Sequence, residues 1–163
     1  MVPNHAQCLL LFDKYELPSL KRVHVETVAK LALFLAKRLQ LNQPNLVLNF
    51  MLIEAAALLH DIDKKISQRE GERHPDAAVR VLKDLGFTEV ADVVRKHSLH
   101  AILDAALTPQ TWEEKLVYLA DKMTKYEVIG VDHRFKLWYQ ENLPPDARNI
   151  LDAGFPKVKG LEK

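Results

Sequence analysis

Apolar residues recur along this chain at the three- and four-residue spacing of amphipathic α-helices, and short polar breaks separate these stretches. The clearest stretch begins at Pro18 or Ser19 and continues to about Leu41. Its apolar positions return roughly once per helical turn, at Val23, Val28, Leu31, Leu35 and Leu39. The pattern therefore predicts a long helix with one apolar face.

Turn residues divide the rest of the chain into further helical stretches. We expect a helix in each of the ranges 6–16, 45–60, 74–85, 88–97, 111–123, 134–141 and 146–153. Asn45 and Thr88 are predicted helix caps, and Thr111 with Glu114 fits a capping box. The charged residues 62–73 predict a loop.

We find no convincing pair of strands, no internal repeat and no low-complexity stretch. At 163 residues the chain is long enough to bury the core of one domain. The sequence therefore predicts an all-α, single-domain helical bundle over residues 1–163, with a helical extension at about 130–155.

Composition narrows the function classes. Lysine and arginine nearly balance aspartate and glutamate, giving a net charge of +1. The chain lacks a basic stripe, so a nucleic-acid duplex is not the expected partner. Cys8, the single cysteine, excludes an internal disulfide, fits a reducing cytoplasm, and is expected to be a small core residue. No apolar run has the length of a membrane span, and the amino terminus lacks a secretion signal. We expect a cytoplasmic protein without a membrane partner; whether it forms a homodimer stays open.

The dipeptide His60-Asp61 closes the apolar run of residues 50–59. Burying an imidazole and a carboxylate there is costly unless something pairs with them. A divalent cation would offset that cost, since both groups are good ligands for first-row metals. Alternatively, His60 is a satisfied core histidine and Asp61 caps the next turn.

Four more residues of the same chemical types are attached to predicted helices: His24, His74, His97 and Asp121. Each has a structural alternative, as a surface histidine, a helix-start residue or a cap. His97 also competes with His100, which lies three residues later on a neighbouring helical face. Because these positions are far apart in the sequence, only folding could gather them around a metal.

The segment from Leu58 to Lys64 resembles the signature of the HD-domain superfamily of metal-dependent phosphohydrolases, and the segment from Tyr118 to Lys122 resembles its closing aspartate motif. The resemblance covers roughly residues 20–125. It implies two groups of metal ligands: for a first ion His24, His60, Asp61 and Asp121, and for a second ion His74 and His97, with Asp61 as the bridge.

The resemblance also implies the chemistry. Two neighbouring cations lower the pKa of a shared water and neutralise phosphate oxygens. Asp61, as the ligand that bridges them, and Lys64, as a contact to phosphate, are therefore the expected catalytic residues. Iron, manganese, nickel and magnesium all remain candidates. A closed structural zinc site would favour cysteines, of which the chain has one.

Substrate contacts are expected from the charged loop and its surroundings. Lys64 follows His60 by four residues and is expected to meet a phosphate oxygen, although a solvated loop lysine is an equal alternative. Arg73 and His100 are the other expected substrate-binding residues. Asp63 could bind a metal-bound water or cap a turn, and the turn is the favoured role. Outside this pattern, two histidines are expected on the surface and three aromatic residues in a core or interface: His5, His133, Trp112, Trp138 and Tyr139.

The histidine spacing is most similar to small bacterial two-metal HD proteins that cleave dinucleoside tetraphosphates. Those relatives continue past the last aspartate with an acidic-proline-arginine segment, where this chain has residues 123–127, Met-Thr-Lys-Tyr-Glu. The expected function is hydrolysis of a small, nucleotide-like phosphate compound. A single-metal nucleotidase, a non-catalytic metal or nucleotide sensor, and a helical interaction module without metal are the alternatives.

Overall fold

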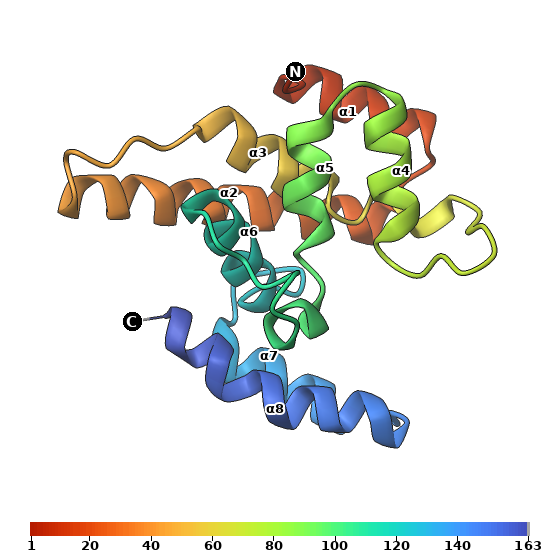
Figure 1. Ribbon diagram of the computed structural model, residues 1–163, viewed down its shortest axis with the longest axis vertical. Helices are drawn as coiled ribbons and strands as arrows, with labels where there is room; N and C mark the ends of the chain where they lie inside the picture. The colour runs from red at the N-terminus through yellow and green to blue at the C-terminus, as the bar shows by residue number, and fades with distance from the viewer. Residues whose placement is uncertain (163) are drawn as a thin grey trace.

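The protein is described here by a computed structural model, which covers residues 1–162. These residues form eight α-helices and two short 3-10 helices without a β-strand, which confirms the all-α prediction (Figure 1). In chain order they are α1 His5–Lys14, α2 Ser19–Asn42, α3 Phe50–Leu59, η1 Ile62–Lys65, α4 Asp76–Asp84, α5 Thr88–Arg95, η2 Leu99–Leu103, α6 Trp112–Lys122, α7 Gly130–Gln140 and α8 Pro145–Leu161.

The long helix α2 lies at the centre of the first part of the fold and packs against α3 and α6 (Figure 1). A first core fills the space among α1 to α6, with Phe12, Val28 and Leu59 among its fully buried side chains. A second core joins η2 and α6 to α7 and α8 and contains Tyr118 and Phe135. Helix α6 contributes to both cores, so the end of this helix lies where the two meet.

Two predicted caps differ from the structure. The side chain of Asn49, rather than Asn45, accepts the Leu52 N–H at the start of α3, because residues 46–49 are non-helical and delay the helix. Thr88 is the first residue of α5 and its side chain makes no cap bond. The capping box of Thr111 and Glu114 is confirmed at the start of α6.

Other boundaries were also misplaced. Helix α7 begins four residues earlier than predicted, at Gly130, whose φ of 79° suits glycine. Helix α8 extends well past residue 153 and includes Pro156, since Leu151, Gly154 and Val158 continue its buried face. The predicted loop at 62–73 contains η1, and η2 was not predicted.

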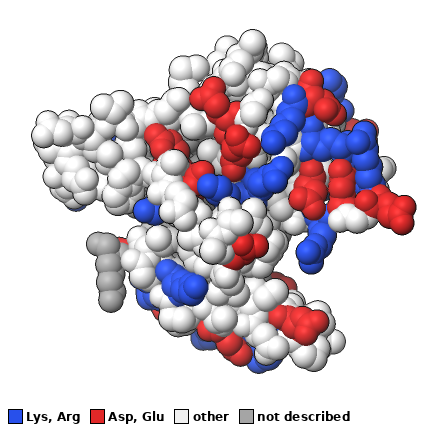
Figure 2. Space-filling model, viewed as in Figure 1, with Lys and Arg blue, Asp and Glu red and all other residues white. Residues whose placement is uncertain are grey.

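Cys8 lies in the first core, as expected, and burial raises the pKa of its thiol to about 12. On the right and lower parts of the visible face, basic and acidic side chains lie next to one another (Figure 2). Within residues 1–162, no helix has both the length and the apolar character needed to cross a bilayer. The assignment of the whole chain to one domain stays a prediction.

Candidate metal centre

The ends of several helices meet at one point and deliver the six residues predicted as metal ligands. His24 comes from the second turn of α2, and Asp121 from the last turn of α6. The other four flank helices: His60 and Asp61 follow α3, His74 precedes α4, and His97 follows α5. The structure thus brings together positions separated by up to 97 residues.

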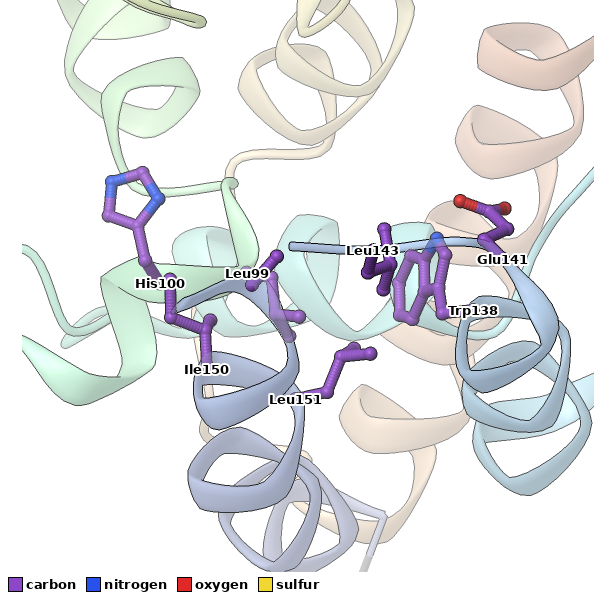
Figure 3. Close-up of a pocket in the computed structure, with 8 residues that line it drawn as sticks. Leu99, His100, Trp138, Glu141, Leu143, Ile150 and Leu151 are labelled. Carbon is purple, nitrogen blue, oxygen red and sulfur yellow. The ribbon is translucent and has the colours of Figure 1, made fainter. Parts of the chain in front are cut away.

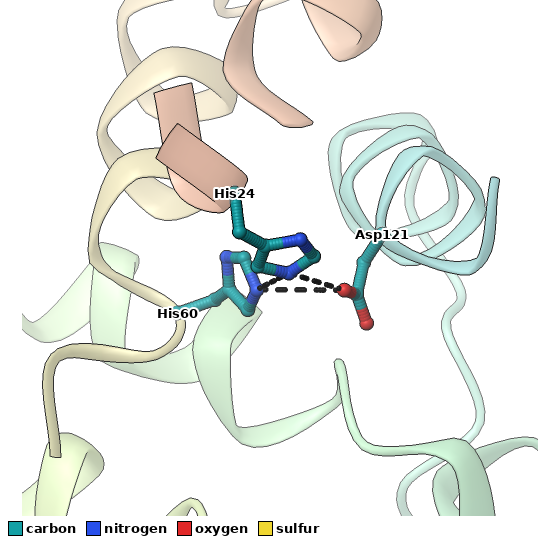
Figure 4. Close-up of side chains that lie close together, drawn as sticks. All are labelled: His24, His60 and Asp121. Carbon is teal, nitrogen blue, oxygen red and sulfur yellow. Dashed lines mark hydrogen bonds and ion pairs between the residues drawn. The ribbon is translucent and has the colours of Figure 1, made fainter. Parts of the chain in front are cut away.

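The first cluster joins His24, His60 and Asp121, whose side chains converge in Figure 4. His24 Nε2 lies 3.0 Å from Asp121 Oδ1 and 3.3 Å from His60 Nε2. The distance from His60 Nε2 to Asp121 Oδ1 is 3.5 Å. Nitrogen and oxygen ligands that each lie about 2.0–2.2 Å from one cation are roughly 3.0–3.5 Å apart, so the three atoms have the spacing of a shared ion.

Backbone carbonyls fix which histidine nitrogen faces the cluster. Nδ1 of His24 donates to Lys125 O at 2.6 Å, and Nδ1 of His60 donates to Ala57 O at 2.7 Å. In the neutral rings the Nε2 atoms therefore carry lone pairs. Two nitrogen lone pairs and the carboxylate of Asp121 face one another with no donor among them, an arrangement that a cation stabilises.

A second cluster lies beside the first. His74 Nε2 is 2.9 Å from His97 Nε2 and 3.4 Å from Asp61 Oδ1. His97 Nδ1 donates to Val94 O at 2.7 Å, so its Nε2 also presents a lone pair. Between His97 and its competitor His100, the structure brings only His97 into this arrangement.

The side chain of Asp63 contacts a predicted metal ligand, His74, instead of capping a turn. Its buried carboxylate accepts a hydrogen bond from His74 Nδ1 at 2.9 Å. A carboxylate in this position fixes the ring orientation and the tautomer of a histidine ligand and raises its basicity. The turn prediction was wrong because loop 66–73 folds back and brings residue 74 to residue 63.

Asp61 stands between the two clusters. Its Oδ2 lies 4.0 Å from His60 Nε2, whereas its Oδ1 faces His74. Lys21 contacts Oδ2 at 2.8 Å and Lys64 contacts Oδ1 at 2.9 Å. Burial works to raise the pKa of Asp61, but the positive charges of His60, Lys64 and further neighbours outweigh it and the pKa is lowered. Asp61 is thus an ionised group that reaches both clusters.

Lys122 is the buried partner of Asp121. Its ammonium group is ion-paired with Asp121 Oδ2 and donates to His97 O at 2.6 Å. Burial works to raise the pKa of Asp121, but the positive charge of Lys122 helps to outweigh it, and the pKa lies well below the usual value. Lys122 therefore holds one oxygen of Asp121 and leaves the other for the cluster.

The clusters open into a cavity of about 370 Å³. Lys64 and His100, predicted to bind substrate, line it. Arg73 does not; it lines a neighbouring cavity of about 190 Å³ together with Arg95. The lining also includes residues that the sequence analysis did not select: Lys21, Ser98, Leu99, Lys122, Arg134 and Trp138. Lys21 could have been found, since it precedes His24 by three residues on one helix face.

The metal-free protein is expected to lose stability as the pH falls from 6.5 toward 5. Burial and the charges of His60 and His74 hold the pKa of His97 well below its usual value, so below about 6.5 the unfolded chain takes up a proton that the native state excludes. The contribution is at most about 1.4 kcal/mol per pH unit. Thermal melting with chelator will show it, and His97→Gln should flatten the slope, whereas the exposed control His133→Gln should not.

His60 does not oppose this trend in the same window. Burial works to lower its pKa, but Asp61 and Asp121 raise it above the usual value. The stabilisation from a raised histidine pKa is fully present below about pH 6.5 and is lost only as the pH rises through the folded pKa. An unchanged slope in His97→Gln would contradict the assignment of the pH effect to His97.

Comparison with known proteins agrees with this geometry. The HD domain family model matches residues 23–126, more than half of the chain, and the protein therefore belongs to the HD-domain family. Members of this family are generally metal-dependent hydrolases, and the histidine and aspartate clusters described above could hold the metal.

The chain is also 26% identical, over 161 residues, to a tRNA (cytidine(56)-2'-O)-methyltransferase of Picrophilus torridus. The alignment covers 91% of this chain and 45% of that protein, so the chain spans less than half of the length of this relative. No solved structure matches the chain.

Proposed function

We propose that the protein is a two-metal phosphohydrolase that cleaves a phosphate ester or anhydride of a small, nucleotide-like substrate. One observation carries this proposal: two adjacent clusters of imidazole lone pairs and carboxylate oxygens, with Asp61 between them. The first would be held by His24, His60 and Asp121, and the second by His74 and His97.

When bound, divalent cations lower the pKa of water and neutralise the negative charge of a phosphate group. The chain supplies the surrounding charges. Lys21 and Lys64 lie at the cavity wall, where each forms an ion pair with Asp61. When the substrate enters, their ammonium groups can pair with its phosphate oxygens instead. Arg73 and Arg95 line the adjoining cavity and would bind a further phosphate group of an anhydride.

Mixed imidazole and carboxylate ligands favour iron, manganese or nickel, with magnesium as a weaker candidate because it prefers oxygen ligands. The proposed partner is a small phosphorylated molecule in the cytoplasm, not a nucleic-acid duplex. We do not extend methyl transfer from the Picrophilus torridus relative to this chain, because the site offers ligands for hydrolytic metal chemistry. Dinucleoside tetraphosphates remain one member of the proposed substrate class.

Metal counting separates the two-ion site from a single-ion nucleotidase. We expect His74→Ala to lower the metal content from two ions per chain to about one, since His24, His60 and Asp121 retain their geometry. His100→Ala is the matched control and should keep both ions, as it lies outside the clusters. Elemental analysis of dialysed, manganese-loaded protein measures the content. A single ion in the parent protein would contradict the two-metal arrangement.

Hydrolysis of a chromogenic phosphate ester by protein loaded with manganese or iron tests the proposed function itself. Release of phosphate that depends on the metal supports the enzyme. Bound metal with no turnover on a panel of mono-, di- and polyphosphorylated compounds would instead identify a sensor domain.

A further inference from the structure

A second cavity, of about 320 Å³, adjoins the metal cavity and shares three lining residues with it: Leu99, His100 and Trp138. It lies between η2 and the two C-terminal helices (Figure 3). Small-molecule sites typically occupy about 300–1,000 Å³, so each cavity alone is at the lower end of that range. A substrate that extends from one cavity into the other would use both.

The second cavity has the opposite chemistry to the first. In Figure 3, Leu99, Leu143, Leu151 and the indole of Trp138 surround the hollow, and His100 and Glu141 lie at opposite ends. Charged phosphates have no partner among these leucines, whereas a flat ring system buries its faces against them. The carboxylate of Glu141 can accept hydrogen bonds from N–H groups at the edge of such a ring.

Two buried donors in the wall of the metal cavity, next to the residues that the cavities share, have no partner among the described residues. Ser98 Oγ and Arg134 Nε each lack a hydrogen-bond partner, and both residues line the metal cavity. The Arg134 guanidinium lies over the Trp138 ring, 4.2 Å from its centroid. Buried polar groups without partners are costly, and phosphate or ribose oxygens at the junction would satisfy them.

We propose that the apolar cavity holds the nucleobase of the substrate, with Trp138 as a specificity-determining residue and with Arg134 and Ser98 contacting the phosphoribosyl part. This inference rests on the proposed function for the position of the reacting phosphate. Trp138 also packs edge-to-face on Phe135 of the second core, so the core placement expected from the sequence and a ligand contact coexist in one side chain.

Tryptophan fluorescence tests the subsite without turnover. The chain has two tryptophans, and Trp112 lies at the first position of α6, outside both cavities. In Trp112→Phe, where Trp138 is the only reporter, guanosine or adenosine monophosphate with magnesium should give saturable quenching. Ribose 5-phosphate should not. In Trp138→Phe, where Trp112 reports, neither compound should cause quenching.

A filled pocket tests the same subsite through kinetics. Ala147→Phe places a ring in the apolar cavity and should lower kcat/KM for a nucleotide about tenfold or more, the scale of one lost base-stacking contact. Its kcat/KM for ribose 5-phosphate should stay within twofold. Ala153→Phe, on an exposed position of the same helix, is the matched control and should change neither value.

The outcomes separate the two proposals. Quenching of Trp138 by nucleotides in a protein that hydrolyses no phosphate compound keeps the base subsite and overturns the hydrolase. Hydrolysis with equal losses on both substrates in Ala147→Phe, or quenching by ribose 5-phosphate alone, overturns the base subsite. Circular dichroism of each variant excludes unfolding as the cause, and Trp112→Phe gives a result that needs no pocket substitution.

Discussion

Asp61→Asn should lower the rate of metal-dependent phosphate hydrolysis by at least about 10³-fold. Removing one electrostatic contact to the reacting centre typically lowers kcat by this amount. The carboxylate of Asp61 reaches both clusters, with one oxygen 3.4 Å from His74 Nε2 and the other 4.0 Å from His60 Nε2. Asparagine has the same size but lacks the charge that two cations need from a shared ligand. Initial rates on a chromogenic phosphate ester measure the effect, and elemental analysis should show a matching loss of metal.

Two other aspartates calibrate this result. Asp63→Asn removes the charge that orients His74 and should cost about 10–100-fold in metal affinity or activity. Asp84→Asn, exposed at the end of α4, should leave the rate unchanged. An Asp61→Asn protein that is folded and retains more than a tenth of the activity would show that Asp61 does not join two ions.

The sequence predicted the positions that meet at the candidate metal centre because two of its segments resemble the HD-domain motifs. Apolar spacing added that each of these residues sits within or beside an amphipathic helix. A histidine or aspartate following an apolar run, as in His60-Asp61, has to be either paired or bound to something. Several such residues in one chain narrow the choice to a shared site.

Contacts that depend on the path of the chain between helices could not be predicted. Asp63 lies eleven residues from His74, and nothing in the intervening charged residues indicates that they fold back. Arg134 comes from α7, beyond the last motif, and reaches the cavity only because α7 and α8 pack under η2 and α6. The length of α8 was also missed, because proline is a helix breaker in local rules while tertiary packing here continues the helix past Pro156.

The same limit applies to charge pairs inside the core. Lys122 follows Asp121 directly, and adjacent residues on a helix do not normally face each other. Both side chains are nevertheless buried and paired, since Lys122 extends beneath the Asp121 carboxylate to the His97 carbonyl and over the Tyr118 ring. This pairing is visible only in the folded structure, and it gives the second large prediction.

Lys122→Met is expected to destabilise the metal-free protein by about 3–5 kcal/mol, the usual cost of removing one partner from a buried ion pair. Methionine keeps the length and apolar contacts of the lysine, but Asp121 then remains as a buried charge without its cation. Urea unfolding in the presence of chelator measures the loss. Saturating manganese should recover part of it, because a cation at His24, His60 and Asp121 again compensates that charge.

A double variant shows whether the uncompensated charge is the cause. Asp121→Asn combined with Lys122→Met removes both charges and should be more stable than Lys122→Met alone. With the single variant Asp121→Asn added, the double-mutant cycle gives the coupling energy of the pair. The exposed control Lys136→Met on α7 should change the free energy of unfolding by no more than about 0.5 kcal/mol. If Lys122→Met behaves like this control, the ion pair does not stabilise the metal-free centre, and the geometry of Asp121 must be maintained by His24 and the packing of α6 against α2.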